Sequence, residues 1–598
     1  MCGIAGIIKK SNSVVTVSEV KLMTDLMAHR GPDDAGCFIN NNFGLGHRRL
    51  SIIDISAAGH QPFVYQNIQI IFNGEIYNYI EIREELRQLG CVFNTETDTE
   101  VITAAYKQWG EACVNKFNGM WSFCIYDSDK EIFFCSRDRF GVKPFYYTDN
   151  GDQFLFASEI KALLPFVDNR KANRKNLLDY LVLGFEEHNE DTFFEGIKKL
   201  PASHSLIYDL KNHSFNINKY YTLQIHDDYK GLNIDDSVAL FKDKLTDAVK
   251  LRLRSDVKVG SCLSGGLDSS SIVAIASGLY DHSEPFNAIN AKSIDSGNDE
   301  SSFAQTVTDY LGINKHVIVP GLDDFDNLID DVIATQEEPF GSLSILMQYC
   351  VFKKAREINC TVMLDGQGGD EILLGYQKYY CSLFFSLPLW EKFKAIRALK
   401  LNGSLSLIGI IQTYLYFGFS SIRIRRLKHK FNFVKKEHLS HCSFDLVKKF
   451  SSKLKNIDEL QQFELFNLQL PHLLKYEDKN SMRHSIESRL PLLDYRVVET
   501  ALSLNNKFKI YNGWSKYPIR KAFEDILPAE IVWRKDKIGF AAPESLIINK
   551  NREKMLTQIK ASNLLKQLLI TVPDNLSARH LWRLYNICKW ENAYNITL

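Results

Sequence analysis

The chain changes its hydrophobic pattern once, near residue 235, and this change requires two different folds within one polypeptide. Up to about residue 205, short apolar segments alternate with turns, and few helices are expected between them. After a polar stretch at 226–235, apolar strands alternate with amphipathic helices. The length of 598 residues agrees with this division, because a single hydrophobic core does not grow to that size.

The first part is predicted to be rich in β-strands that form two stacked sheets. Its clearest apolar segments are 3–8, 68–72, 121–126 and 132–135. One helix is expected at Asp98–Trp109, where Thr97 and Asp98 form the cap and Gly110 is the stop. We therefore expect an α+β domain built as a two-sheet sandwich.

The second part is predicted to be an α/β domain with a parallel sheet and helices on both faces. A long helix at 237–254 leads into an apolar strand at 257–263, and the alternation continues to a strand at 361–364. Between these we expect a helix from 269, a strand at 286–290, a helix from 299, a strand at 316–319 and a helix at 344–358. Ligands of such sheets bind at the carboxyl ends of the strands. Beyond Glu371 the chain is predicted to be mainly helical.

Charge and cysteine content exclude several classes of protein. Lys+Arg and Asp+Glu each number 72, so no overall field would recruit nucleic acid or anionic lipid. The 12 cysteines are scattered without zinc-like spacing, which is typical of reduced thiols in a cytoplasmic protein. The apolar segment Leu405–Phe419 is shorter than the ~20 residues of a membrane span. A buried or partner-facing helix is therefore expected there, in preference to membrane association.

The second residue is the strongest catalytic candidate in the chain. If the initiator methionine is removed, Cys2 carries both a thiol and a free α-amine. An α-amine has a pKa of about 8, so part of it is neutral at physiological pH and takes up the thiol proton. The alternative is a small buried residue that begins a strand. Its position, followed by Gly-Ile-Ala-Gly, favours a nucleophile that brings its own base.

A glycine turn after the first strand of the second part is predicted to bind phosphate. It reads Leu263-Ser264-Gly265-Gly266-Leu267-Asp268-Ser269-Ser270. The two glycines let the backbone approach an anion, while the serine hydroxyls and the start of the next helix add hydrogen-bond donors. Asp268 is expected to hold Mg²⁺ against a phosphate. A plain glycine turn with a serine cap is the alternative.

A second loop has the same placement between a strand and a helix. It reads Leu364-Asp365-Gly366-Gln367-Gly368-Gly369-Asp370-Glu371. Three glycines in four residues indicate a backbone packed against a ligand, and Asp370 and Asp268 are expected to share one Mg²⁺. Alone, this loop could be a tight turn. Beside the first loop, it predicts a nucleotide cleft.

With Cys2 and both glycine loops, the chain resembles the glutamine-hydrolysing asparagine synthetase family. The resemblance covers residues 1 to about 380 and about 455–545, and it includes the HRGPD segment His29–Asp33. It implies a class II glutamine amidotransferase domain of the N-terminal-nucleophile hydrolase fold at 1–221 and a linker at 222–235. The remaining residues, 236–598, would form a PP-loop synthetase domain. An insertion at about 380–455 is not covered by the resemblance.

For the first domain, the resemblance implies a complete glutamine site. Arg49 is expected to bind the α-carboxylate bidentately, and Asp98 to receive the α-amino group. The Asn73 side chain and the Gly74 backbone N–H are expected to form the oxyanion hole for the attack by Cys2. The residues expected to contact glutamine are Arg49, Leu50, Ser51, Ile52, Ile53, Asn73, Gly74, Glu75 and Asp98.

For the second domain, the resemblance implies cleavage of ATP between its α- and β-phosphates and an acyl-adenylate. ATP and Mg²⁺ are therefore expected, with Asp268 and Asp370 as the metal ligands. A late lysine should neutralise the pyrophosphate, and we predict Lys537 for this role, with Lys535 second. The residues expected to contact ATP are Leu263, Ser264, Gly265, Gly266, Leu267, Asp268, Ser269, Ser270, Ile289, Asp365 and Gly366.

Gln367 departs from the family pattern. Asparagine synthetases usually carry glutamate there, and a glutamine amide cannot accept the proton that the attacking ammonia must lose. Either another base acts, or the carboxylate acceptor is not aspartate. Gln367 is a candidate for the acceptor site, near which the segments 481–489 and 491–494 are also expected. The aromatic and basic insertion further resembles that of relatives that amidate sugar acids.

The sequence thus predicts glutamine- and ATP-dependent amidation of a carboxylate, with ammonia carried through a sealed passage. Aspartate is the expected acceptor, and a uronic acid of a surface polysaccharide is the alternative. An inactive scaffold on this fold is an alternative of another class, against which the intact Cys2, Arg49, Asn73, Asp98, Asp268 and Asp370 argue. The expected partners are small molecules, without nucleic acid or a transmembrane span. A homodimer is one option for the assembly.

Overall fold

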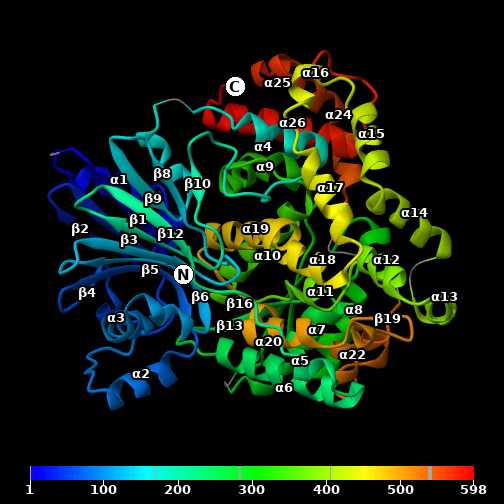
Figure 1. Cartoon of the computed structure of the whole chain (residues 1–598), viewed down its shortest axis with the longest axis horizontal. Helices are drawn as coiled ribbons and strands as arrows, with labels where there is room; N and C mark the ends of the chain where they lie inside the picture. The colour runs from blue at the N-terminus through cyan, green and yellow to red at the C-terminus, as the bar shows by residue number, and fades with distance from the viewer. Residues whose placement is uncertain (1, 12, 169, 282–283, 404–405, 536–541) are drawn as a thin grey trace.

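Figure 1 shows the computed structural model of the chain, in which a domain of stacked sheets lies beside a helix-rich domain. The structure describes all residues except 1, 12, 169, 282–283, 404–405 and 536–541. The strand-rich part, coloured blue to cyan, occupies the left of the view, and the helical remainder lies to its right.

Two antiparallel six-stranded sheets form the N-terminal domain. Their strand orders are β10-β8-β9-β1-β3-β2 and β12-β11-β7-β6-β5-β4. The first sheet comprises β1 (Gly3–Lys9), β2 (Asp34–Asn40), β3 (Phe43–Arg49), β8 (Tyr146–Asp149), β9 (Gln153–Ala157) and β10 (Lys198–Lys199). The second comprises β4 (Phe63–Tyr65), β5 (Ile68–Ile76), β6 (Gly119–Asp127), β7 (Ile132–Arg137), β11 (His204–Asp209) and β12 (Ser214–Lys219).

The two sheets pack face to face, because alternate side chains of their central strands are apolar. Ile4 of β1 and Ile71 of β5 belong to the same buried cluster between the sheets. The outer faces are covered by helices: α1 (Val17–Asp25) packs on the first sheet, and α2 (Tyr79–Gln88) and α3 (Asp98–Trp109) pack on the second. The predicted two-sheet sandwich is confirmed.

Local capping signals place helix ends well. The predicted helix Asp98–Trp109 is confirmed to the residue, because the Thr97 side chain accepts a hydrogen bond from the Glu100 N–H (3.1 Å) and Gly110 ends the helix with φ 60°. The long helix predicted at 237–254 instead runs over Ile234–Arg252 (α6). It begins earlier because the side chain of Asn233 caps the N–H of Asp236.

The C-terminal domain contains a parallel sheet of five strands in the order β15-β14-β13-β16-β17. The strands are β13 (Val259–Cys262), β14 (Asn287–Ala291), β15 (Asn314–Ile318), β16 (Val362–Leu364) and β17 (Glu487–Arg489). Helices α6 and α7 (Leu267–Leu279) cover one face and α10 (Ser344–Glu357) the other, as predicted. The edge strand β17 was not predicted, because it is three residues long and comes from a mainly helical region.

The rest of this domain is mainly helical, as predicted beyond Glu371. Helix α19 (Gln469–Arg483) runs through the centre of the molecule, between the two domains (Figure 1). The helices α12 (Gln377–Ser386), α13 (Leu389–Asn402), α14 (Leu407–Gly418) and α15 (Ser420–Lys430) follow the outer edge opposite the sandwich. In the described part of the chain, no helix combines the length and hydrophobicity that a membrane span requires.

Candidate active sites

The predicted nucleophile lies at the start of β1, enclosed by the sandwich. Cys2 is buried, and its backbone nitrogen donates a hydrogen bond to Asn73 Oδ1 at 3.0 Å. Burial raises the pKa of the Cys2 thiol, and a hydrogen bond from the backbone of Leu50 works in the opposite direction. The thiol is therefore protonated at rest, and a base close to Cys2 is needed to form the thiolate.

Asn73 and Gly74, the residues predicted to form the oxyanion hole, are neighbours on β5. Asn73 is fully buried, and because its Oδ1 accepts from Cys2, its Nδ2 remains as a donor without a hydrogen-bond partner among the described residues. A Cβ atom at Gly74 would lie 2.1 Å from the carbonyl oxygen of Met120. Only glycine therefore lets β5 pair with β6 at this point.

A buried cluster of acidic groups surrounds the position expected for the glutamine α-amine. Asp98 Oδ2 accepts a hydrogen bond from the Ile76 N–H (3.0 Å), and burial raises the pKa of Asp98 to about 6. Burial, Glu487 and Asp98 raise the pKa of Glu75. Arg489 offsets part of this charge, with its Nη2 at 4.0 Å from Glu75 Oε1. The cluster has more carboxylates than cations, so a substrate ammonium would be stabilised there.

Arg49 and the residues after it connect the sandwich to the second domain. Arg49 Nη1 donates to the carbonyl of Ser56 (2.7 Å), and Nη2 donates to that of Asp54. Ser51 N–H donates to Asp33 Oδ2 (2.8 Å). The side chains of Leu50, Ile52 and Ile53 are buried in a core that also contains residues of the second domain, so their contacts with glutamine would come from the backbone.

The first glycine loop lies at the carboxyl end of β13, as predicted. Gly265 has φ 82°, and a Cβ there would lie 2.8 Å from the backbone nitrogen of Ala304. The hydroxyls of Ser264 and Ser269 are hydrogen-bonded to each other at 3.0 Å, at the N-terminus of α7. The backbone N–H of Leu263 donates to the carbonyl of Ile289 (2.9 Å). The side chain of Ile289 itself is buried in the core, as is Ser270.

The second glycine loop packs directly on the first. A Cβ at Gly366 would lie 3.0 Å from the nitrogen of Ser269, and one at Gly369 would lie 2.7 Å from Asp268 Oδ1. Loop-to-loop contact thus requires two glycines that the sequence pattern attributed to a ligand. Burial raises the pKa of Asp365 to about 6. Gln367 is partly buried in the same loop.

Lys516 is a residue of this site that sequence reasoning missed. Its Nζ forms ion pairs with Asp268 and with Asp370 Oδ1 (2.8 Å), so one cation bridges both predicted metal ligands. It follows β19 (Trp514–Ser515), far from either loop in the sequence. One feature of the sequence could have led to this lysine. Two carboxylates on neighbouring loops need a cation between them when they are buried. Lys535 instead donates to the carbonyl of Leu401 (2.6 Å), and Lys537 lies outside the described residues.

The two aspartates fit a divalent cation bound together with phosphate. Asp268 Oδ1 is buried without a hydrogen-bond partner among the described residues. Asp370 forms an ion pair with Lys516, as Asp268 does. Within the described ranges, no group of three or more His, Cys, Asp or Glu side chains could hold a metal ion by itself. Mg²⁺ suits such a site, because it is commonly bound by one or two carboxylates and substrate phosphates.

Buried charges on α19 and β17 connect the two domains. Arg30 Nε donates to the carbonyl of Cys2 (3.0 Å), and Arg30 Nη1 donates to Asp478 Oδ2 of α19 (2.9 Å). Arg489 is fully buried, and its carbonyl accepts a hydrogen bond from the N–H of Asp365 (3.0 Å). The segment 481–489, expected near the acceptor site, thus approaches the predicted glutamine site, because the Arg489 side chain lies beside Glu75.

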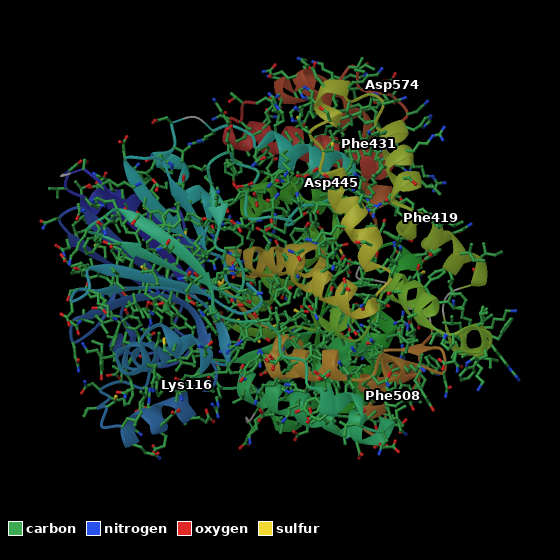
Figure 2. The ribbon with its side chains drawn as sticks, viewed as in Figure 1. Lys116, Phe419, Phe431, Asp445, Phe508 and Asp574 are labelled. Atoms are coloured by element: carbon green, nitrogen blue, oxygen red, sulfur yellow. The ribbon has the colours of Figure 1, made fainter. Side chains whose placement is uncertain are left out.

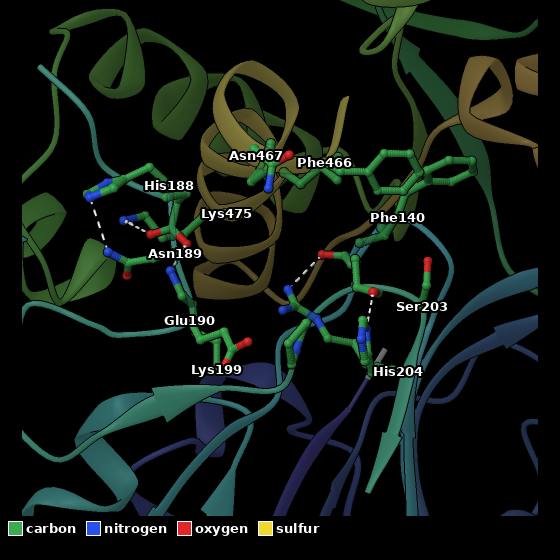
Figure 3. Close-up of a pocket in the computed structure, with 18 of the residues that line it drawn as sticks. Phe140, His188, Asn189, Glu190, Lys199, Ser203, His204, Phe466, Asn467 and Lys475 are labelled. Carbon is green, nitrogen blue, oxygen red and sulfur yellow. Dashed lines mark hydrogen bonds and ion pairs between the residues drawn. The ribbon is translucent and has the colours of Figure 1, made fainter. Parts of the chain in front are cut away.

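Figure 3 shows a cavity of about 790 Å³ at the junction of the domains. Phe140 of the sandwich stacks on Phe466 (ring centroids 5.9 Å apart) in its wall, and Lys475 of α19 pairs with Glu187 (2.8 Å). Neither Cys2 nor the two glycine loops line this cavity. It is therefore separate from both predicted catalytic sites.

Both halves of the chain match known families. Residues 1–221 match the glutamine amidotransferase domain family, and residues 240–583 match the asparagine synthase family. A putative glutamine-hydrolyzing asparagine synthetase of Methanocaldococcus jannaschii is 40% identical, covering 69% of this chain and 83% of that protein. A glutamine-hydrolyzing asparagine synthetase of Bacillus subtilis is 32% identical, covering 90% of this chain and 87% of that protein.

Proposed function

Because the chain belongs to the asparagine synthase family, we propose that it converts aspartate to asparagine with glutamine as the nitrogen donor. The reaction is ATP + L-aspartate + L-glutamine + water to AMP + diphosphate + L-asparagine + L-glutamate. The observation that carries the proposal is Arg489, which is buried between the two sites. Its side chain lies beside Glu75, and its backbone carbonyl holds the N–H of Asp365.

In the first half-reaction, Cys2 attacks the side-chain amide of glutamine. After removal of Met1, the α-amine takes the thiol proton, and the thiolate adds to the amide carbon. The oxyanion is stabilised by Asn73 Nδ2 and by the Gly74 N–H. The Asn73 side chain is oriented by the hydrogen bond that its Oδ1 accepts from the Cys2 nitrogen. The carbon–nitrogen bond breaks, the ammonium of Cys2 protonates the leaving nitrogen, and water then hydrolyses the thioester to glutamate.

The rest of the glutamine molecule is held by charge. The ammonium group is placed against Glu75 and Asp98, whose pKa values are raised first by burial and further by Glu487. The α-carboxylate is assigned to Arg49, whose guanidinium is fixed by the carbonyls of Ser56 and Asp54. Asparagine would be a poor substitute, because its amide is one methylene closer to these anchors.

The released ammonia is proposed to travel through the buried interface to the second site. One hydrophobic cluster contains Met120 and Val142 of the sandwich together with Leu490 and Leu492 of the synthetase half. Exclusion of water keeps ammonia unprotonated, and only the neutral form has a lone pair for attack. The buried ion pair of Arg30 with Asp478 of α19 also joins the two domains.

In the second half-reaction, the aspartate side-chain carboxylate attacks the α-phosphorus of ATP, and pyrophosphate leaves. The loop Ser264–Ser269 is assigned to the leaving phosphates, because it presents hydroxyls and the N-terminus of α7. Lys516 would balance the charge that develops on them. Ammonia then attacks the acyl carbon, AMP leaves, and the departing phosphate takes up the proton that the nitrogen loses.

Mg²⁺, when bound with ATP, would be held by Asp268 and Asp370 and would neutralise phosphate charge. The side chain of Asp268 touches the second glycine loop, so both carboxylates face one small volume. Lys516 would then exchange its contacts with these aspartates for contacts with phosphate oxygens.

Gln367 is assigned to orienting the acceptor, because an amide has no useful basicity. The uronic-acid alternative is based on this residue and on the insertion, whereas the relatives reported above are named asparagine synthetases. Aspartate is therefore the first acceptor to test.

The test is pyrophosphate release by the purified chain with ATP, Mg²⁺ and glutamine, across aspartate and a series of uronic acids. Mass spectrometry should identify asparagine as the amide product with aspartate. Pyrophosphate release with a uronic acid and none with aspartate would contradict the proposed acceptor. Absence of glutamate and pyrophosphate release under all conditions would favour the scaffold alternative.

A further inference from the structure

The insertion exposes a row of large apolar side chains at the outer edge of the molecule. On α14, Ile408, Ile411 and Leu415 are 68%, 49% and 45% exposed, and Phe419 directly after the helix is 44% exposed. The spacing of three and four residues places them on one face of the helix. Figure 2 shows Phe419 at this edge, between α14 and α15.

The opposite face of α14 is anchored in the protein. Ile410 is buried, and Tyr414 and Phe417 pack against the same cluster as α12 and α17 (Phe444–Lys453). The helix contains no charged residue. One face of α14 thus fixes the helix to the body, and its other apolar face remains uncovered.

Helix α13 adds a second group of exposed apolar side chains. Leu389, Trp390 and Phe393 are 77%, 60% and 74% exposed. This helix is also anchored, because Leu399 is buried and Glu391 pairs with Lys507 (3.0 Å). Isolated apolar side chains on a surface are ordinary, whereas several large ones on two successive helices point to a binding surface.

The charge of this region identifies the kind of partner. Between residues 387 and 430 there are nine Lys and Arg residues and one acidic residue, Glu391, in a chain whose total charge is zero. Seven of the cations are exposed: Lys394, Arg397, Lys400, Arg425, Arg426, Lys428 and Lys430. They flank the apolar row on both sides along the chain, so the surface joins exposed aromatic and aliphatic groups to uncompensated positive charge.

We propose that this arm, the described residues of 387–430, binds the surface of a membrane that contains anionic lipids. Amphipathic helices with Trp, Phe and Leu on one side and Lys and Arg beside them insert into the headgroup region. Cations near such a surface add electrostatic attraction to the insertion of the apolar side chains. The sequence favoured a buried or partner-facing helix at 405–419 over membrane association, whereas Ile408, Ile411 and Leu415 of α14 are exposed beside a basic segment.

The arm also fixes which side of the protein faces the lipid. Asn402 Nδ2 at the end of α13 donates to the carbonyl of Asn512 (2.9 Å), in the hairpin of β18 (Ile510–Tyr511) and β19 that precedes Lys516. A bound arm would bring the synthetase half to the membrane and leave the sandwich on the far side, as the arrangement in Figure 1 indicates. This inference is independent of the identity of the acceptor.

The test is flotation of the full chain with vesicles of phosphatidylcholine alone or mixed with phosphatidylglycerol. We expect binding to the anionic vesicles only, weakened by salt because the cations act through screened charge. The variants Trp390→Ala with Phe393→Ala, and Arg425→Glu with Arg426→Glu, should each weaken binding at least about tenfold. The control Arg87→Glu with Val92→Ser, exposed residues of the sandwich, should bind like the wild type.

Thermal melting and synthetase activity should be unchanged in all variants, since each altered side chain is largely exposed. Absence of flotation with anionic vesicles at low salt would overturn the proposal, as would arm variants that bind like the wild type. A second copy of the chain is the competing occupant of this surface. If light scattering shows a dimer that Trp390→Ala with Phe393→Ala dissociates, and vesicles are not bound, the surface is a contact between copies.

Discussion

The two halves of the molecule assemble their sites in different ways. In the sandwich, one strand supplies Asn73, Gly74 and Glu75 in succession, and the backbone of Cys2 is bonded to the first of them. In the synthetase half, Asp268, Asp370 and Lys516 come from three distant segments and meet through ion pairs.

This difference predicts different responses to substitution. Strand pairing fixes the glutamine site, so a single side chain can be removed there while its neighbours stay in place. The nucleotide site depends on the balance of buried charges, so loss of one charge leaves the others uncompensated.

The largest effect is expected for Cys2→Ala. Glutamine-dependent synthesis and glutamate release should fall at least about 10³-fold, because no other group can form the thioester. Synthesis with ammonium chloride as donor should remain near the wild-type rate, since the second site is untouched. Measured glutamate release that persists in Cys2→Ala would remove Cys2 from its assigned role.

Lys516→Ala should lower the rate of synthesis at the second site by roughly 10²- to 10³-fold. The loss should be the same with glutamine and with ammonium chloride as the nitrogen donor. The physical reason is the loss of the only cation described between Asp268 and Asp370. Lys535→Ala is the matched control and should retain most activity, because Lys535 contacts the carbonyl of Leu401. Near-normal pyrophosphate release by Lys516→Ala, with a large loss in Lys537→Ala, would reassign the role to Lys537.

Asp98 should give the glutaminase a specific pH dependence. Burial raises the pKa of Asp98 to about 6, so this carboxyl becomes protonated below pH 6 and no longer pairs with the substrate ammonium. The kcat/KM for glutamate release should therefore fall about fivefold between pH 6 and pH 5. Asp98→Asn should have low kcat/KM at all pH values and lack this acidic limb. An unchanged profile in the variant would show that another group titrates.

Asp478→Asn is expected to have the smallest effect on rate and to act on the junction of the halves. The pKa of Asp478 is affected most by burial, which raises it, but Arg30 and Lys143 outweigh burial and lower it. Because it replaces one member of a buried ion pair, the variant should lower the free energy of unfolding by about 3 kcal/mol. It should also raise the ratio of glutamate to asparagine formed above one.

The stability difference for Asp478→Asn has a defined pH window. A carboxyl whose pKa is lowered on folding stabilises fully above its unfolded-state pKa of about 3.9, and this stabilisation is lost as pH falls through the folded-state value. The difference in melting temperature between the wild type and Asp478→Asn should therefore be larger at pH 7 than at pH 3. Equal melting temperatures at pH 7 would contradict a stabilising role for the pair.

The features that could be predicted from the sequence are those whose determining residues lie within one short segment. The helix Asp98–Trp109 has its cap and its stop within the segment, and both glycine loops carry their own turn residues. Lys516 and β17 could not be predicted, because their roles arise only when distant segments meet. The same is true of Arg489, whose side chain and backbone serve different sites. For α14 the sequence left a buried and a partner-facing helix open, because an apolar helix has the same composition whether it is buried or uncovered.

We infer that ammonia passes between the halves without mixing with bulk solvent. The direct measurement uses glutamine with a ¹⁵N-labelled amide in the presence of excess unlabelled ammonium, with mass spectrometry of the asparagine formed. We predict that the product amide keeps the label of glutamine almost completely. Dilution of the label to the isotope ratio of the bulk ammonium would contradict a sealed connection between Cys2 and the synthetase site.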